Sequence, residues 1–239
     1  MNKVYLVGSG VGDAQLLTIK AYKLIELCDI LIYDRLVSDD ILKLANKDAE
    51  KIYVGKKKGE HCKTQDQINQ IVVDAARTGK KVVRLKGGDP LIFGRGAEEA
   101  LFLKEHGFDF EFVPGISAAN GCSASSLIPL THRNLVNGYR VLTGHFKGSD
   151  DINNLNWDKI ADDECLLVVY MGLTNIDLIV RKLLENGLDA NTSAAIIENG
   201  TLEGERKFFA KLGGLPDLVE QNNINSPALI YIGKTVDLF

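Results

Sequence analysis

Short apolar runs alternate with amphipathic segments along the first half of the chain. In the amphipathic segments, apolar residues recur every three or four positions, which is the spacing of one helix face. The apolar runs predict strands at Val4–Val7, Ile30–Tyr33, Ile52–Val54, Lys81–Leu85 and Phe110–Val113. The amphipathic segments predict helices at Gln15–Leu27, Asp39–Ala45, 64–77 and Ala97–His106. This alternation favours a mostly parallel sheet with helices on both faces.

Polar residues mark where two of these helices begin. Ser38 directly precedes the second amphipathic segment and can cap it with its hydroxyl. Thr64 precedes the third, and Gln67 follows three residues later. This spacing predicts a capping box, in which each side chain bonds the other residue's main chain.

The character of the chain changes after Pro114. We expect a helix of small residues at Ile116–Ser126 and a second helix at Thr174–Glu185. Strands are predicted at Tyr139–Thr143, Leu166–Tyr170, Ala194–Glu198, Lys207–Lys211 and Ala228–Ile232. The third and fourth of these can pair antiparallel through the turn at 199–205. We therefore expect two α/β domains, residues 1–114 with a mostly parallel sheet and residues 115–239 with a mixed sheet.

The composition is typical of a folded globular chain. Of the 239 residues, 45% are hydrophobic and 25% are charged, which excludes collagen-like and disordered classes. The longest apolar stretch, Leu166–Met171, is too short to span a bilayer. No signal peptide precedes the strand at Val4, so we expect a cytoplasmic protein without membrane association.

Charge and cysteine spacing narrow the ligand class. A formal net charge of −4 argues against nucleic-acid binding, but cations concentrate at 51–63 and 84–95, beside glycine-rich turns. A binding site for a small anionic ligand would explain this concentration of cations. A solvated surface of lysines explains the three lysines at 56–58 equally well. The four cysteines contain no C-x-x-C pair and are expected to be free thiols, and no metal site is expected.

Two glycine-rich turns each leave a predicted strand and enter a predicted helix. Gly8–Asp13 has the spacing G-x-G-x-G, which departs from the dinucleotide fingerprint, although Asp34 lies about where a ribose-binding acid would stand. Lys86–Gly96 holds four glycines and a proline, more than a simple turn needs. Because open α/β sheets bind ligands at the carboxyl ends of their strands, we expect both turns to border a ligand site.

A series of motifs along the chain points to one family. The motifs are Val7–Asp13, Tyr33–Ser38, Val54–Lys56, Arg84–Glu99, Pro114–Ile116, Pro129–Arg133, Thr143–His145, Tyr170–Gly172, Glu198–Thr201 and Ser226–Ile230. In content and order they resemble the tetrapyrrole methylase family, a class III group of S-adenosylmethionine-dependent methyltransferases, and within it the uroporphyrinogen-III C-methyltransferases. The resemblance covers essentially the whole chain.

The resemblance implies two α/β domains, a homodimer, and S-adenosyl-L-methionine held in the cleft between the domains and released as S-adenosyl-L-homocysteine. It implies two methylations of uroporphyrinogen III, at C-2 and C-7, that give precorrin-2 for sirohaem or cobalamin synthesis. Asp34 takes the position of the proton acceptor and Lys56 that of the proton donor. The implied cofactor contacts are Val11, Gly87, Gly88, Asp89, Ile92, Ser117, Ala118, Met171 and Gly200.

The implied substrate carries many carboxylates, so basic residues are candidates to bind it. The first candidates are Arg35, Arg95, His132 and Arg133, and further ones are Arg84, Lys86 and Arg140. Some of these are expected to form salt bridges within the protein instead. The chain also departs from the family pattern, which usually has proline at Val11 and Ala14, glycine at Ala97 and threonine at Ser117. Without the two prolines we expect a looser first turn.

Three other functions stay open at this point. The chain can be a tetrapyrrole methylase that acts at another ring carbon. It can be a nicotinamide-dependent oxidoreductase that uses Gly8–Gly12, although the glycine spacing argues against this. It can also be a tetrapyrrole-binding module without catalysis, although Asp34, Lys56 and both glycine turns favour an enzyme.

Overall fold

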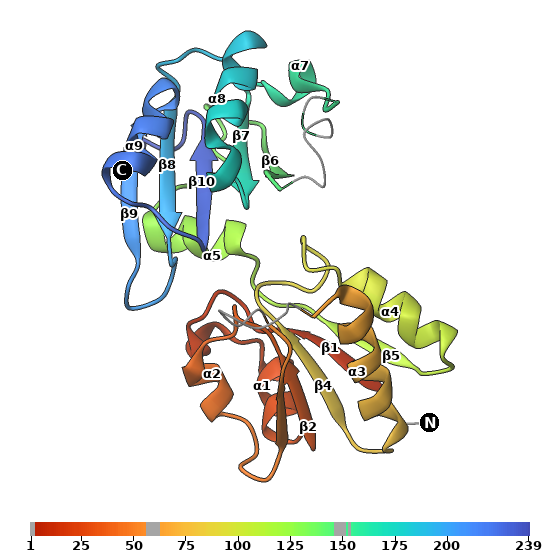
Figure 1. Ribbon diagram of the computed structural model, residues 1–239. Coiled ribbons are helices and arrows are strands. Elements are labelled where there is room, and N and C mark those ends of the chain that lie inside the picture. The colour runs from red at the N-terminus through yellow and green to blue at the C-terminus, as the bar shows by residue number, and fades with distance from the viewer. Residues whose placement is uncertain (1–2, 56–62, 146–151, 153) are drawn as a thin grey trace. The chain divides into compact units, whose positions relative to one another are not determined.

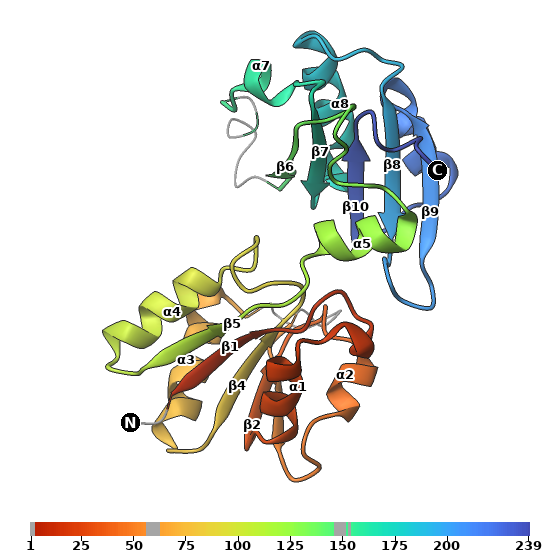
Figure 2. The same cartoon turned by 180° about the vertical axis from the view of Figure 1, so that it is seen from behind.

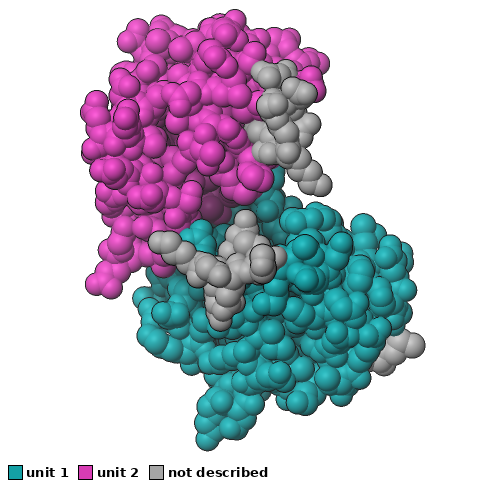
Figure 3. All heavy atoms as spheres, in the orientation of Figure 1, with its two compact units in different colours: residues 1–117 teal, residues 118–239 magenta. Residues whose placement is uncertain are grey.

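The computed structural model describes residues 3–55, 63–145, 152 and 154–239. The chain divides into two compact units, Met1–Ser117 and Ala118–Phe239, coloured separately in Figure 3. The division falls after Ser117, whereas the sequence analysis placed a boundary after Pro114. Each unit is a sheet with helices on its faces (Figure 1).

The first unit contains a five-stranded sheet in the order β3-β2-β4-β1-β5, and all its strand pairs are parallel. The strands are β1 (Val4–Gly8), β2 (Ile30–Tyr33), β3 (Glu50–Tyr53), β4 (Val82–Lys86) and β5 (Phe110–Val113). The helices are α1 (Ile19–Glu26), α2 (Asp39–Lys43), α3 (Gln65–Arg77) and α4 (Gly96–Glu105). The predicted parallel sheet is confirmed. Its carboxyl ends all lie at one edge because every connection crosses back over a face.

Alternation along the strands separates two cores in this unit. Val7 and Leu85 point to the face that α1 and α2 cover, whereas Leu6 and Val82 point to the face that α3 and α4 cover. Figures 1 and 2 show the two helix pairs on opposite sides of the sheet. A residue's position in the strand therefore decides which helix pair it meets.

The predicted caps are present, but one predicted helix is shorter than expected. Ser38 Oγ accepts a hydrogen bond from the Ile41 amide, and Thr64 and Gln67 form the capping box. The single helix predicted at Gln15–Leu27 is wrong. A 3₁₀ turn, Ala14–Leu16, comes first, and α1 starts afresh at Ile19 because the Thr18 hydroxyl caps it by accepting from the Ala21 amide at 3.2 Å.

The second unit contains a mixed five-stranded sheet in the order β6-β7-β10-β8-β9. Its strands are β6 (Gly138–Thr143), β7 (Cys165–Tyr170), β8 (Ser193–Glu198), β9 (Arg206–Lys211) and β10 (Ala228–Ile232). Strands β6 and β7 are parallel, and the other neighbours are antiparallel, including the predicted β8–β9 pair. The mixed sheet is therefore confirmed. Since β7 and β8 both run antiparallel to β10, the ends of β6, β7 and β8 share one edge.

Helices of unlike character cover the two faces of this sheet. On one face pack α7 (Trp157–Ile160), α8 (Ile176–Glu185) and α9 (Leu215–Gln221), with large aliphatic side chains. On the other face lies α5 (Ala118–Ser126), which is made of Ala, Ser, Gly, Asn and Cys. The sequence analysis missed α7 and α9. Within α9, Pro216 lies in the first turn, where proline favours a helix start.

Several expectations about single residues can be compared with the described part of the chain. Cys28 and Cys122 are buried free thiols, Cys165 is a half-buried free thiol, and Cys62 lies outside the described residues. Burial raises the pKa of Cys28 to about 11 and that of Cys122 to about 12. No described helix combines the length and apolarity needed to cross a bilayer.

Candidate active site

The two glycine-rich turns of the first unit are joined to each other at the carboxyl edge of the sheet. The Gly10 amide donates to the Gly88 carbonyl at 3.1 Å, and the Gly88 amide donates to the Gly10 carbonyl at 2.7 Å. Both residues have positive φ, +70° and +67°, which glycine adopts without strain. Because these two amides bond each other's carbonyls, they are not free to hold an anion in the way that a phosphate-binding loop does.

A third segment packs directly against this joint, main chain on main chain. A Cβ on Gly115 would lie 2.3 Å from the Gly88 carbonyl oxygen, and a Cβ on Gly8 would lie 2.5 Å from that same atom. The Asp89 carboxylate secures the contact, since its Oδ2 accepts from the Gly115 amide at 3.2 Å and its Oδ1 accepts from the Leu91 amide at 2.8 Å. Only residues without a side chain allow this approach.

The other predicted cofactor contacts in the second glycine-rich turn, Gly87, Gly88 and Ile92, have different surroundings. A Cβ on Gly87 would lie 2.5 Å from the Leu36 Cβ, so packing alone requires a glycine there. A Cβ on Gly88 would meet no protein atom within 4 Å, which leaves its main chain open on that side. Ile92 is 40% exposed although it is apolar. Gly88 and Ile92 therefore provide an open main-chain surface beside an apolar side chain.

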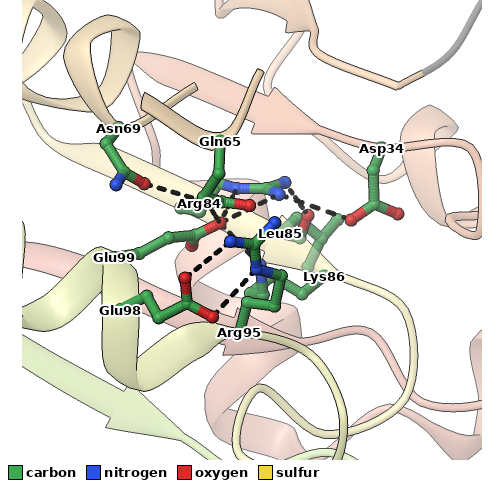
Figure 4. A network of polar contacts seen from close by, with 9 residues as sticks. All are labelled: Asp34, Gln65, Asn69, Arg84, Leu85, Lys86, Arg95, Glu98 and Glu99. Atoms are coloured by element: carbon green, nitrogen blue, oxygen red, sulfur yellow. Dashed lines mark hydrogen bonds and ion pairs between the residues drawn. The ribbon is translucent and has the colours of Figure 1, made fainter. Parts of the chain in front are cut away.

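A buried network of charges lies on the α3–α4 face of the same sheet (Figure 4). Arg84 and Lys86 alternate with Leu85 on β4, so both point to this face. The Glu99 carboxylate on α4 accepts hydrogen bonds from Lys86 Nζ at 2.7 Å and from Arg84 Nη2 at 3.3 Å. Asp34, which directly follows β2, has its Oδ2 at 3.5 Å from Arg84 Nη2.

Burial separates the members of this network. Arg84, Lys86 and Glu99 are at most 4% exposed, whereas the side chain of Asp34 is 26% exposed. Burial and the neighbouring Arg84 lower the pKa of Lys86, against the opposing effect of Glu99. The Asp34 Oδ1 also accepts from the Leu36 amide at 3.1 Å. Asp34 is thus a fixed carboxylate that solvent or a ligand can reach.

In the second unit, two tyrosine hydroxyls hold the start of α5. The Ala119 amide donates to the Tyr170 hydroxyl at 2.7 Å, and the Tyr231 hydroxyl donates to the Ala119 carbonyl at 2.9 Å. Tyr170 ends β7 and Tyr231 lies on the adjacent β10, with both rings on the α5 face. Ala118, a predicted cofactor contact, is the first residue of the helix that they secure.

Met171 and Gly200 follow β7 and β8 at the edge where both strands end. Met171 has a φ of +54°, which is uncommon for a residue other than glycine. It is also 47% exposed although its side chain is apolar. A Cβ on Gly200 would lie 2.3 Å from the Cys122 sulfur on α5. Packing against α5 therefore requires glycine at position 200, whether or not a ligand binds there.

The structure places the other predicted residues as follows. Val11 and Ser117 are half-buried, and both make contacts within the protein. Arg35 and Arg133 are exposed. His132 is half-buried, and its Nδ1 lies 3.4 Å from the Asn134 amide. Lys56 lies outside the described residues.

Among the candidate cations, Arg84, Lys86, Arg95 and Arg140 have partners within the protein. Arg95 has a left-handed backbone with a φ of +56° and binds Glu98 through two nitrogens at 2.9 and 2.6 Å. Arg140 lies 3.6 Å from Asp162. Lys86 is buried against Glu99, which agrees with the expectation that some of these cations form salt bridges within the protein.

Sequence reasoning did not single out Glu99. A signal was present, because Gly96, Glu99, Ala100 and Leu103 form the buried stripe of α4 at helical spacing. A glutamate in such a stripe needs a buried cationic partner. Arg84 and Lys86, in an otherwise apolar strand, are those partners. Among the residues that the structure describes, no group of three or more His, Cys, Asp or Glu is placed to hold a metal ion.

The fold and these motifs agree with the comparisons to known proteins. The family model of the tetrapyrrole (corrin/porphyrin) methylases matches residues 3–216, and the chain belongs to this family. Its relatives include the siroheme synthase of Pseudomonas putida, which is 48% identical over 236 residues. That match covers 99% of this chain and 50% of the relative, so the chain spans about half the length of the curated relatives it matches.

Solved structures give the same result over the full chain. A uroporphyrin-III C-methyl transferase from Thermus thermophilus, complexed with S-adenyl homocysteine, is 38% identical with a TM-score of 0.83 and covers 100% of both chains. A cobalt precorrin-4 methyltransferase, a cobalamin biosynthetic enzyme, is 26% identical with a TM-score of 0.86 and covers 98% of this chain and 96% of its own.

Proposed function

We propose that the chain is an S-adenosylmethionine-dependent C-methyltransferase that methylates uroporphyrinogen III twice, at C-2 and C-7, to give precorrin-2. The observation that carries this proposal is the full-length likeness to a uroporphyrin-III C-methyl transferase with S-adenyl homocysteine bound. We further propose that it acts in the cytoplasm as a homodimer and serves sirohaem or cobalamin synthesis.

The residues of the candidate site fit the proposed cofactor. The open side of Gly88 and the exposed, apolar Ile92 and Met171 suit a ligand whose reactive centre is a sulfonium, because a cation beside it would repel it. Val11, Gly87, Asp89, Ser117, Ala118 and Gly200 complete the proposed set of contacts. When bound, S-adenosylmethionine supplies an electrophilic methyl group. The chain must orient the donor and the acceptor carbon in line.

Asp34 is the proposed proton acceptor. Its carboxylate lies beside Arg84, is oriented by the Leu36 amide and stays partly exposed, as a base must be to reach a substrate proton. Lys56 is proposed as the donor from the family resemblance alone. Arg35, Arg95, His132 and Arg133 are proposed to bind substrate carboxylates.

Methyl counting tests the proposed reaction. Uroporphyrinogen III incubated with labelled S-adenosylmethionine should incorporate two labelled methyl groups per ring. Incorporation into another tetrapyrrole only would indicate a methylase for a different ring carbon. The absence of any incorporation, with S-adenosylhomocysteine binding retained, would favour a binding module without catalysis.

A single substitution tests the role of Asp34. Asp34→Asn keeps the size of the side chain but removes its basicity, so kcat should fall roughly a hundredfold, in the range typical of general base catalysis. Asp48→Asn, at an exposed loop position, is the matched control and should keep full activity. An unchanged kcat in Asp34→Asn would remove this residue from proton transfer.

Calorimetry separates the proposed cofactor from a nicotinamide. The pyrophosphate of NAD needs free main-chain amides at the glycine turn, whereas the Gly10 and Gly88 amides each donate to the carbonyl of the other residue. S-adenosylhomocysteine should therefore bind with measurable heat, and NAD should not. Binding of NAD alone would support the oxidoreductase.

A further inference from the structure

Glu99 is the centre of the buried network, and its two carboxylate oxygens have unequal surroundings. Oε1 is within hydrogen-bond distance of Lys86 Nζ at 2.7 Å, Gln65 Nε2 at 3.3 Å, and both Nε and Nη2 of Arg84 at 3.3 Å (Figure 4). Oε2 is buried and has no hydrogen-bond partner among the described residues. The contacts of this carboxylate therefore converge on a single atom.

The guanidinium of Arg84 is held by the Leu85 carbonyl and by the carboxylates of Glu99 and Asp34. Its Nη1 donates to the Leu85 carbonyl at 2.9 Å, and its Nη2 lies between Glu99 Oε1 at 3.3 Å and Asp34 Oδ2 at 3.5 Å. Among the described residues, the only hydrogen bond to the Asp34 carboxylate apart from that of Arg84 comes from the Leu36 amide. The orientation of the Asp34 carboxylate thus depends on where Glu99 holds Arg84.

Charge gives Glu99 a second influence on Asp34. Arg84 and Lys86 are two buried cations on one strand, and Glu99 neutralises one of the two charges. The remaining positive charge faces the half-buried Asp34. Removing a single buried partner leaves the others uncompensated, so a change at Glu99 acts on all three residues.

We propose that Glu99 is a positioning residue for the reaction: it holds Arg84 against Asp34 and so sets the orientation of the base. This inference rests on the proposed function, because it takes Asp34 as the proton acceptor. Glu99 itself is 1% exposed, so its proposed role is to position Arg84 and not to contact the substrate.

A double-mutant cycle between Glu99→Gln and Asp34→Asn tests this inference. In the wild-type background, Glu99→Gln should lower kcat roughly tenfold, with the Kd for S-adenosylhomocysteine unchanged within about twofold. In the Asp34→Asn background, the same substitution should have almost no further effect, because residues that act as one unit are not additive. Glu105→Gln, the same change at an exposed position of α4, should leave kcat unchanged in both backgrounds.

The outcomes separate this inference from the function on which it rests. An inactive wild-type protein would overturn the proposed function. An unchanged kcat in Asp34→Asn would overturn only the role of the base. An equal loss from Glu99→Gln in both backgrounds, or a loss that follows weaker cofactor binding, would show a merely structural Glu99 and overturn the positioning role alone.

A second variant keeps the test decisive if Glu99→Gln does not fold. Glu99→Asp retains the negative charge that Arg84 and Lys86 need, but is one methylene shorter and cannot hold Arg84 at the same place. It should fold, lower kcat severalfold and show the same lack of additivity with Asp34→Asn. Full activity in Glu99→Asp, combined with additive behaviour, would overturn the inference.

Discussion

Both units are five-stranded sheets with helices on both faces, yet their candidate residues have different chemistry. The first unit brings charged side chains to its site, namely Asp34, Arg84, Lys86 and Glu99. The cofactor contacts proposed in the second are main chain and neutral groups, namely Ala118, Met171 and Gly200. The proposed proton acceptor thus lies in the first unit, whereas the proposed cofactor contacts come from both units.

Sheet topology explains how both units can gather residues despite this difference. In the parallel sheet, the ends of β1, β2 and β4 meet at one edge, so Gly10, Asp34 and Gly88 lie near one another. In the mixed sheet, β6, β7 and β8 share a direction, because β10 lies between β7 and β8. Met171 and Gly200 therefore end at a common edge as well.

The largest expected effect is in the first unit, at the contact between glycine main chains. Gly8→Ala puts a Cβ 2.5 Å from both the Gly115 amide nitrogen and the Gly88 carbonyl oxygen, and main chain cannot easily move aside. We expect a loss of about 3 kcal/mol in the free energy of unfolding, measured with denaturant, and loss of S-adenosylhomocysteine binding.

Gly138→Ala is the matched control, since a Cβ there meets nothing within 4 Å. It should stay within about 0.5 kcal/mol of the wild type. A Gly8→Ala variant with wild-type stability would mean that the three glycine segments are less tightly packed than described.

The corresponding change in the second unit should be smaller and reversible by a second substitution. Gly200→Ala puts a Cβ 2.3 Å from the Cys122 sulfur, a side-chain atom that a further change can remove. We expect a loss of about 2 kcal/mol in the free energy of unfolding and weaker S-adenosylhomocysteine binding. Cys122→Ala in the same chain should restore part of both, whereas additive losses would refute the contact.

The smallest effect concerns a surface carboxylate that lies far from both candidate sites in sequence. Hydrogen bonds from Ser193 and Lys211 hold the pKa of Asp237 below its ordinary value. A lowered carboxyl pKa stabilises the fold above the unfolded-state value of about 3.9, and this is lost as pH falls through the folded value. Asp237→Asn should therefore cost less than about 1 kcal/mol at pH 7, because the pair is half exposed, and nothing near pH 2. An equal cost at both pH values would exclude the ionic contribution.

The sequence predicted the strands well because their apolar runs are short and sharply bounded. Ile30–Tyr33, Phe110–Val113 and Ala228–Ile232 have the predicted limits. The start of α1 was misplaced because Leu16 and Leu17 continue the helical spacing while Thr18 interrupts it with a cap. Periodicity does not register such a local hydrogen bond.

The candidate site was predictable in its motifs but not in its internal contacts. Glycines and charged residues that directly follow strands can be read from spacing, as at Gly88 and Asp34. The burial of Lys86 could not be read in this way, because its partner Glu99 comes from a helix that follows a long turn. Pairing across such a separation depends on how α4 packs on the sheet.

The tyrosine pair under α5 has one more consequence. Helix α5 consists of small residues, whose smooth surface offers little resistance to sliding along the sheet. The hydroxyls of Tyr170 and Tyr231 bind the amide and the carbonyl of a single residue, Ala119. These two bonds together fix the position of α5 along its own axis. A shift by one residue would break both bonds together. Two phenolic oxygens thereby do for this helix what interlocking bulky side chains do for α8.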